Sequence, residues 1–565
     1  MTSWYRNAVV YQADVRMFHD SDGDGWGDVR GLTRRLDYLR GLGATAVWLL
    51  PFYTSPFRDG GYDVEDHLAV DPRLGDVADV ARMLEAADDL GLHVLLDLVC
   101  QHTSDQHRWF QEARSSRKSP YRDYYVWSDE PVETGVEPMF PDVEDGVWTW
   151  DEEAQQFYRH SFYSFEPDLA LDNPRVRDEL WRIMTFWLRL GVSGFRVDAV
   201  PHMVERARAA DPSDGGQWLV REMRDVADRH GQDAVLLGEV DVEPQQYADY
   251  FGTRDTGHGD GMTMLLDFYL NNHLFLALAR DDARPLVEAL GRHPQPPQHG
   301  AYAQWLRNHD ELDLEQLTAV ERDDVLKAFA PTSHEQAYGR GIRRRLAPML
   351  DGDVRRVAMA HAVLFSLPGP PVLRYGDEIG MGDDLSLPER EAVRTPMQWT
   401  DGPNAGFSTA PADRLVAPVI TDGPFGHRRV NVYEQMVQPD SLLTKVGQMI
   451  RARLGLRETG TVTPEPVEVR LASGGAAHPV LALRYAHEGS WVLMLTNLAD
   501  EDLEVALCVE TADAPFVDVL ADQPYGQVGG ATVPVDGVER PVARLAAHGY
   551  RWLRPRDRHG VCEAP

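Results

Sequence analysis

Short apolar runs typical of buried strands alternate with segments of helical period along most of the chain. The eight strand-like runs are AVVYQADV (8–15), TAVWLLPF (45–52), HVLLDLV (93–99), VSGFRVDAV (192–200), AVLLGEV (234–240), MTMLLDF (262–268), AYAQWLR (301–307) and PPVLRYGD (370–377). Segments with helical period occur at 31–42, 77–90, 174–191, 215–230 and 353–366. This alternation is typical of parallel strands joined by crossover helices, and eight such units predict an α/β fold, a closed (β/α)8 TIM barrel.

Two segments interrupt the alternation, and a third segment follows it. Residues 103–173 are rich in Trp, Tyr, Pro and acidic residues without a clear period, which predicts an inserted, loop-rich subdomain B after the third strand. Residues 321–348 follow the seventh strand and end in an arginine cluster that we expect over the barrel mouth: Arg340, Arg343, Arg344 and Arg345. From residue 465 apolar residues alternate with period two, which predicts a C-terminal antiparallel β-sandwich. The predicted domains are the catalytic barrel (1–102 and 174–464, with the insertion 321–348), subdomain B (103–173) and the C-terminal β domain (465–565).

The composition argues against some classes of partner. The 565 residues include 56 basic and 90 acidic ones, a formal charge of −34, whereas nucleic acids and anionic membranes attract positively charged surfaces. No run approaches the length of a membrane span, and the first residues show no signal-peptide pattern. The three cysteines, Cys100, Cys508 and Cys562, are scattered, and their odd number gives no disulfide framework. We therefore predict a cytoplasmic protein with no nucleic-acid or membrane partner, and the sequence leaves a homo-oligomer open.

Polar side chains gather at the predicted carboxyl ends of the strands, where a barrel of this kind carries its catalytic groups. The fourth strand ends in GFRVDAV, in which Arg196 and Asp198 share one face because residues i and i+2 of a strand point to the same side. The other strand ends contribute Tyr62 and Asp63, His102, Glu239, His309 and Asp310, and Arg394. A purely structural salt bridge would explain an isolated Arg-x-Asp. It does not explain why carboxylates, histidines and arginines gather at one end of the barrel.

Several carboxylates at one mouth suit glycoside hydrolysis, which needs one ionised carboxylate and one protonated carboxylic acid. Asp198 should stay ionised because the adjacent Arg196 favours the charged form, so it is the natural nucleophile. Glu239 follows an apolar strand without an adjacent cation, so we expect its pKa to be raised enough for a general acid. A sugar-binding subunit that has lost catalysis is the alternative from another class, and the intact Asp198, Glu239 and Asp310 argue against it.

Four short blocks, DLVCQH (97–102), GFRVDAV, GEV (238–240) and RNHD (307–310), together resemble those of the α-amylase family, glycoside hydrolase family 13. The resemblance covers nearly the full chain. It implies a retaining enzyme with Asp198 as nucleophile, Glu239 as acid/base and Asp310 as transition-state stabiliser, and such an enzyme would hold the first two carboxyl groups about 5–5.5 Å apart. The implied supports of the reacting sugar are Arg196, His102 and His309, with Tyr62 stacked on the sugar and Asp63 and Arg394 closing the far side of its pocket.

Further segments narrow the resemblance to the trehalose synthases, which interconvert maltose and trehalose. The similar segments are WLLPFYTSP (48–56), HTSDQHRWFQEAR (102–114), GIRRRLAPML (341–350), YGDEIGMGD (375–383) and VRTPMQWT (393–400). The chain departs from the family pattern at Gln101, Glu166 and Arg374, in or near the predicted pocket, and we expect Glu166 to be a substrate-binding residue. The resemblance implies a small α-glucoside such as maltose or trehalose as substrate and no organic cofactor. A hydrolytic α-glucosidase with the same chemistry is the alternative.

The stretch DSDGDGWGD (20–28) places Asp20, Asp22, Asp24 and Asp28 around glycines. Acidic residues that alternate through a tight turn offer oxygen ligands to a hard cation, as half of an EF-hand loop does, and a solvated acidic turn is the alternative. The family resemblance supports structural Ca²⁺ at this loop, with the Trp26 carbonyl as a further ligand. A second site implied by the family would use Gln101, Asp168 and Glu205.

Overall fold

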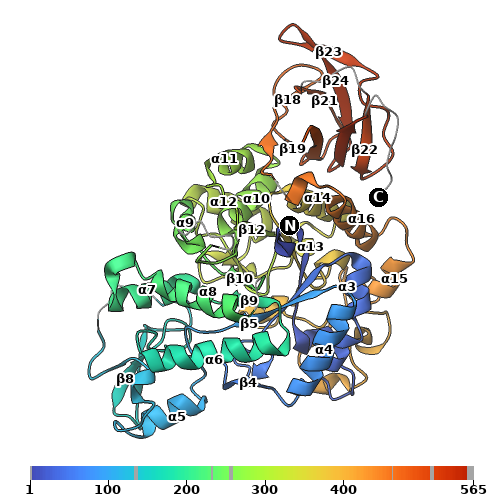
Figure 1. The fold of residues 1–565 in the computed structure, drawn as a ribbon. Helices are drawn as coiled ribbons and strands as arrows, with labels where there is room; N and C mark the ends of the chain where they lie inside the picture. Colours follow the sequence, from blue (N-terminus) through green and yellow to red (C-terminus); the bar gives the residue numbers. More distant parts are fainter. Residues whose placement is uncertain are drawn as a thin grey trace.

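The computed structural model describes residues 3–132, 138–230, 233–252, 259–460, 462–509 and 515–556, so Cys562 and the last part of the predicted C-terminal domain lie outside the described residues. Its centre is a closed barrel of eight parallel strands (Figure 1). In barrel order the strands are β1 (Val10–Ala13), β2 (Ala46–Leu49), β5 (His93–Leu98), β9 (Gly194–Val197), β10 (Val235–Gly238), β11 (Met264–Leu266), β12 (Ala301–Trp305) and β16 (Pro371–Arg374), which pairs with β1. Each predicted strand run contains one of them, and the predicted fold class is confirmed.

The strand that leads to Asp198 depends on a glycine. Gly194 has φ +148°, and a Cβ atom there would lie 2.1 Å from the Val235 carbonyl oxygen of the neighbouring strand β10. Any larger residue would therefore push β9 and β10 apart. The residues of β9 are buried, as expected for a parallel strand covered on both faces.

Helices surround the barrel. They are α3 (Leu36–Leu42), α4 (Val77–Asp89), α6 (Pro174–Leu190), α7 (Val200–Ala210), α8 (Trp218–His230), α10 (Phe268–Arg280), α11 (Arg284–Arg292), α14 (Val354–Ser366) and α16 (Leu442–Leu454). Shorter helices are α1 (Val15–Phe18), α2 (Val29–Thr33), α9 (Tyr247–Phe251) and α15 (Val432–Met436). The sequence analysis did not predict α7, although its buried residues Val200, Met203, Val204 and Ala207 recur with helical spacing.

Subdomain B has more regular structure than the predicted loop-rich segment. It contains α5 (Arg108–Ser115) and an antiparallel sheet in the order β6 (Trp127–Ser128), β8 (Gln156–Arg159), β7 (Trp148–Asp151). Phe110 of α5 stacks on Trp127 with the ring centroids 5.6 Å apart and meets Tyr158 edge-on at 5.1 Å. The aromatic residues that obscured the period are therefore the small core of this subdomain. Before it, β3 (Tyr53–Thr54) pairs with β4 (Asp66–Val70).

The segment after β12 forms a second small sheet near the barrel mouth. Its strands, in the order β13 (Leu312–Asp313), β15 (Gly341–Ile342), β14 (Gln336–Ala337), are antiparallel. The helix α12 (Ala319–Phe329) precedes β14, and α13 (Leu346–Met349) follows β15. The tight turn between β14 and β15 brings Arg340 to the sheet edge.

Two antiparallel sheets follow the barrel. The five-stranded sheet has the order β17 (Glu465–Pro466), β19 (Val480–His487), β20 (Ser490–Asn497), β25 (Tyr550–Pro555), β22 (Phe516–Ala521). The four-stranded sheet has the order β18 (Val469–Leu471), β21 (Leu503–Leu507), β24 (Val538–Leu545), β23 (Thr532–Val535). Both sheets contribute buried residues to one core, Leu495 and Leu553 from the first and Val505 and Leu545 from the second. Figure 1 shows these sheets beyond α14 and α16, far from α5 and β8. Within the described part of the chain, no helix combines the length and the apolar character of a membrane span.

Candidate active site

One guanidinium group connects the carboxylates at the carboxyl ends of β9 and β10. Arg196 Nη1 lies 2.5 Å from Asp198 Oδ1, and Arg196 Nη2 lies 2.5 Å from Glu239 Oε1. The same Nη1 donates to Asp97 Oδ1 at 2.8 Å. Arg196 is fully buried, so the group is a fixed support that holds Asp198 and Glu239 close to one another.

The turn after Asp198 is strained and brings the second carboxylate into place. Ala199 has φ 48° and ψ 42°, a left-handed conformation that costs a residue other than glycine about 1–2 kcal/mol. In this conformation its backbone N–H donates to Glu239 Oε2 at 2.9 Å. The turn therefore orients Glu239 as well as Asp198.

Burial raises the pKa values of both carboxyl groups, Asp198 and Glu239, to different extents. Burial raises the pKa of Asp198 to about 6, against the attraction of Arg196. Burial also raises the pKa of Glu239 to about 7, again with Arg196 opposing it. The expectation that Glu239 has no cation beside it was wrong, because Arg196 comes from the neighbouring strand and contacts both groups. The pKa of Glu239 is raised as expected, and the pKa of Asp198 is raised as well although Arg196 favours its ionised form.

Asp310 belongs to a separate cluster of cations. Its Oδ1 accepts from Arg390 Nη1 at 2.8 Å and from Arg394 Nη2 at 3.1 Å, and His309 Nε2 lies 3.2 Å from its Oδ2. Although burial acts in the opposite direction, these neighbours hold the pKa of Asp310 well below its usual range. Asp310 is therefore a permanently ionised group at the mouth.

Asp63 and Arg394 were both expected to close the far side of the pocket, but the structure does not bring their charged groups together. The carboxylate of Asp63 turns back into its own loop, where it accepts hydrogen bonds from the Ser55 hydroxyl at 2.9 Å and the Arg58 backbone N–H at 3.1 Å. Asp59 takes the expected position instead. Its carboxylate accepts two hydrogen bonds from Arg390, at 2.9 and 3.0 Å, and one from Arg394 at 3.4 Å.

The aromatic and imidazole residues of the prediction lie side by side. The rings of Tyr62 and His309 are stacked with their centroids 5.2 Å apart. The Tyr62 hydroxyl donates to Asp97 Oδ2 at 2.9 Å, which ties this stack to the Arg196 support. His102 Nε2 lies 3.3 Å from the Tyr62 carbonyl oxygen, and burial lowers the pKa of His102 to about 4.

Glu166 is fully buried behind His102. Its Oε1 lies 3.7 Å from His102 Nε2, and its Oε2 accepts from the Tyr163 N–H at 3.3 Å. Burial raises the pKa of Glu166 well above its usual range. Glu166 does not line the cavity described next, so the structure gives it contact with a predicted sugar-binding residue rather than with the cavity itself.

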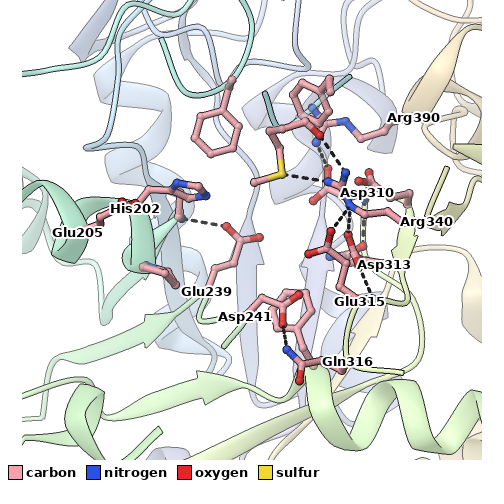
Figure 2. A pocket seen from close by; sticks show the side chains of 18 residues that line it. His202, Glu205, Glu239, Asp241, Asp310, Asp313, Glu315, Gln316, Arg340 and Arg390 are labelled. Carbon is pink, nitrogen blue, oxygen red and sulfur yellow. Dashed lines mark hydrogen bonds and ion pairs between the residues drawn. The ribbon is translucent and has the colours of Figure 1, made fainter. Parts of the chain in front are cut away.

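A cavity of about 400 Å³ opens between the two sets of charged residues (Figure 2). Glu239 and Asp310 both line it, as does Ala199, the residue after Asp198. Figure 2 shows His202 and Glu205 on one side and Asp310, Arg340 and Arg390 on the other, with Glu239 pointing into the space between. Further acidic residues that line it are Glu205, Asp241, Glu311, Asp313 and Glu315. Carboxylates and carboxylic acids of this kind suit a ligand rich in hydroxyl groups.

The four arginines of the insertion lie in different surroundings. Only Arg340 lines the cavity. Arg343 donates to the carbonyl oxygens of Leu385 and Leu387, and Arg344 pairs with Glu335 at 2.9 Å. Arg345 is fully buried against Tyr375, and its Nη1 donates to the Tyr375 carbonyl at 2.9 Å. The prediction that the cluster covers the mouth therefore holds for Arg340 alone.

The acidic loop places three carboxylates in one group. Ligand atoms of Asp20, Asp22 and Asp28 all lie within 4.8 Å of one another. Asp24 is outside this group, and its Oδ1 accepts from the Trp26 N–H at 2.8 Å. Hydrogen bonds from Ser408 and from backbone N–H groups outweigh burial and lower the pKa of Asp20, so this group is ionised. An ionised oxygen cluster on a tight loop fits a hard divalent cation.

At the second predicted cation site, Asp168 is paired with an arginine. Asp168 Oδ2 lies 3.2 Å from Arg159 Nε and accepts from the Ser161 hydroxyl at 2.7 Å. Gln101 also donates to the Ser161 hydroxyl, at 3.4 Å, rather than facing Asp168. Among the residues that the structure describes, three or more acidic, histidine or cysteine side chains come together as a possible metal site at Asp20, Asp22 and Asp28. The second site stays a prediction.

A TIM barrel with an Asp–Glu pair at adjacent strand ends and a third, ionised Asp opposite defines a class of glycoside-cleaving enzymes. A family model described as the alpha amylase catalytic domain matches residues 12–458. The chain belongs to the α-amylase family, and it is an enzyme of glycoside hydrolase family 13.

Known relatives cover almost the whole chain. It is 44% identical over 98% of its length to a protein named trehalose synthase/amylase TreS from Mycolicibacterium smegmatis, of which it covers 93%. It is 39% identical over 98% of its length to the trehalose synthase of Pimelobacter sp., of which it covers 96%. A protein named probable alpha-glucosidase from Rhizobium meliloti is 33% identical over 72% of this chain, which covers 76% of that protein. The solved structure of the trehalulose synthase MutB from Pseudomonas mesoacidophila superposes with a TM-score of 0.75 at 23% identity, over 98% of this chain and 100% of that one, which shows the fold.

Sequence reasoning missed Asp59 and Arg390, and it placed Arg340 at the mouth without its partners Met139 and Asp313. Arg390 lies four residues before Arg394 in a 3-10 turn (Glu389–Val393), and this spacing places both arginines against Asp310. That spacing was a usable signal. Asp59 had no such signal, because it reaches Arg390 and Arg394 across loops whose arrangement in space the sequence does not give.

Proposed function

We propose that this enzyme interconverts maltose and trehalose by cleaving an α-glucosidic bond and remaking it within one cavity. The observation that carries the proposal is the contact of one buried guanidinium, that of Arg196, with both Asp198 and Glu239. Two carboxyl groups on two nitrogens of one guanidinium favour the short spacing of a retaining enzyme, about 5–5.5 Å, over the spacing of about 6.5–9.5 Å that leaves room for water.

In the first step, the Asp198 carboxylate attacks the anomeric carbon while the glucosidic C–O bond breaks. Glu239 gives its proton to the leaving oxygen, and Asp310 stabilises the positive charge that develops on the sugar ring. In the second step, the anomeric hydroxyl of the retained glucose gives its proton to Glu239. Its oxygen then displaces Asp198 from the anomeric carbon, which forms the α,α-linked product with retained configuration.

The choice of substrate rests on the relatives. The two trehalose synthases named above match the chain over nearly its full length, whereas the α-glucosidase relative is less similar and covers less of it. The outer part of the cavity, next to Glu239, is a suitable place for the second glucose. Hydrolysis of the glucosyl-enzyme is the competing outcome with the same catalytic groups.

A structural Ca²⁺ ion on the loop 20–28 is part of the proposal. Asp20, Asp22 and Asp28 would hold it, and it would supply positive charge to a loop that otherwise brings like charges together. Asp28 also begins α2 by accepting from the Gly31 N–H at 2.7 Å, so the ion would fix the start of the first barrel helices. We place the enzyme in the cytoplasm, because its cysteine pattern gives no disulfide framework.

The test is a product analysis of the purified enzyme with maltose and, separately, with trehalose. We expect each disaccharide to yield the other, with some free glucose. The Asp198→Asn variant should fold normally and lose turnover by at least about 10⁴-fold, because it lacks the nucleophile. Free glucose as the sole product at every time point would reject the synthase activity and leave the α-glucosidase alternative. Substantial turnover by a clean Asp198→Asn preparation would reject the nucleophile.

A further inference from the structure

The roof of the active-site cavity comes from two segments that are far apart in sequence. Subdomain B contributes Met139 and Phe140, and the β14–β15 hairpin contributes Tyr338 and Arg340. Phe140 packs on Tyr338 with the ring centroids 4.8 Å apart, within a small hydrophobic cluster that is separate from the barrel core. A small cluster of this kind buries little apolar surface, so polar contacts at its edge matter for keeping the two segments together.

Arg340 forms that edge. Its Nε lies 2.7 Å from Asp313 Oδ2 and 3.2 Å from Glu315 Oε1, both after β12 (Figure 2). Its Nη1 donates to the Met139 carbonyl oxygen at 3.0 Å, and its Nη2 lies 3.0 Å from the Met139 sulfur. Three nitrogens of one side chain thus join the hairpin, subdomain B and the barrel loop, which a lysine could not do.

The contacts of Arg340 are largely shielded from solvent. Its side chain is 11% exposed and that of Asp313 is 16% exposed, so salt screens this ion pair less than it screens a surface pair. Arg340 also carries one of the few positive charges beside the acidic outer cavity. Without it, Asp313 and Glu315 would repel each other and the neighbouring Glu311, and the loop after β12 would move outward.

The roof is connected to the catalytic cluster beneath it. The hydroxyl groups of Tyr163 and Tyr338 both donate to Glu389 Oε2, at 2.6 and 2.7 Å. Glu389 directly precedes Arg390, which binds Asp310. Loosening the roof would therefore open a path for water to the place where the glucosyl-enzyme forms.

We propose that Arg340 is a clasp that closes the outer cavity and determines how the glucosyl-enzyme partitions between water and the retained glucose. The proposal rests on the proposed function, because partition requires transfer. Water exclusion favours transfer, since a second sugar held in place then has no competitor.

The test compares the ratio of free glucose to trehalose formed from maltose by the wild type, Arg340→Met and Arg340→Lys. We expect Arg340→Met to raise the ratio by about threefold or more, and Arg340→Lys to raise it less. Arg344→Met is the matched control, because Arg344 lies in the same segment, pairs with Glu335 and does not line the cavity; it should keep the wild-type ratio. Should Arg340→Met fail to fold, Arg340→Lys carries the test, since it keeps the charge but has one nitrogen in place of the three that make the contacts of Arg340.

A double variant makes the test specific to the clasp. If Arg340 acts through Asp313, then Asp313→Asn alone, Arg340→Met alone and the two together should raise the ratio to a similar level. Additive effects, or a wild-type ratio in folded Arg340→Met, would overturn the clasp while leaving the synthase activity in place. A wild-type enzyme that produces glucose alone would instead overturn the proposed function, and with it any role of Arg340 in keeping water out.

Discussion

At the scale of single residues, the site works because one environment treats two carboxyl groups differently. Asp198 and Glu239 share burial and share Arg196, yet burial raises the pKa of the first to about 6 and of the second to about 7. Asp310, surrounded by arginines, stays ionised throughout. The three carboxyl groups can therefore act as nucleophile, acid and stabiliser within one cavity.

These values predict a bell-shaped pH profile of kcat/KM with its maximum between about 6 and 7. Asp198 must be ionised, so the rate falls as the pH decreases through about 6; Glu239 must be protonated, so the rate falls as the pH increases through about 7. Because the groups interact, the two limbs report the pair. In Glu239→Gln, an aryl α-glucoside whose leaving group needs no proton should show the acidic limb and no basic limb. A basic limb that persists in this variant would reject Glu239 as the acid.

The sequence pattern indicated which candidate catalytic groups come together better than it indicated their neighbours. Asp198, Glu239 and Asp310 end barrel strands, and the strand pattern alone brings strand ends together. Asp63 and Asp59 lie in one loop, and nothing in its sequence tells which carboxylate turns inward. The structure decides this through Ser55 and Arg58, which bind Asp63, and through Arg390, which binds Asp59.

At the scale of elements, the pattern of apolar residues predicted strands well and short insertions poorly. The eight barrel runs have clear lengths and boundaries. The helix α7 was missed because it begins directly at the strand end, within the block that carries Asp198. Subdomain B was predicted without regular structure because its strands, such as β6 (Trp127–Ser128), are too short to show a period.

The loop 20–28 carries the prediction at this scale. Removing divalent cations with a chelator should lower the melting temperature by about 2 °C relative to calcium at about 100 times its Kd, because the ion binds only the folded loop. Asp22→Asn should reduce this difference, because it removes one charged ligand from the group. The measurement is thermal unfolding with and without calcium, combined with elemental analysis. A melting temperature that changes with neither chelator nor calcium would contradict a calcium site on this loop.

At the scale of the whole molecule, the barrel supplies the chemistry and the inserted segments enclose it. Subdomain B and the hairpin β14–β15 meet over the cavity, while β20 and β22 of the five-stranded C-terminal sheet pack against α14 and α16, away from it. The sequence predicted the presence of these parts but not their meeting, because the contacts of Arg340 with Met139 and Asp313 depend on how separate loops fold back. In this account, the balance between transfer and hydrolysis therefore depends on how subdomain B and the hairpin β14–β15 fold together.

The most direct test of this account is the conversion of unlabelled maltose in a solution that contains isotope-labelled glucose. A cavity that keeps the first glucose until the new bond forms predicts trehalose almost free of label, while the glucose in solution stays labelled. Mass spectrometry of the isolated trehalose measures this directly. Trehalose labelled in proportion to the glucose in solution would show that the leaving sugar escapes before transfer, and would contradict the enclosed transfer on which the account depends.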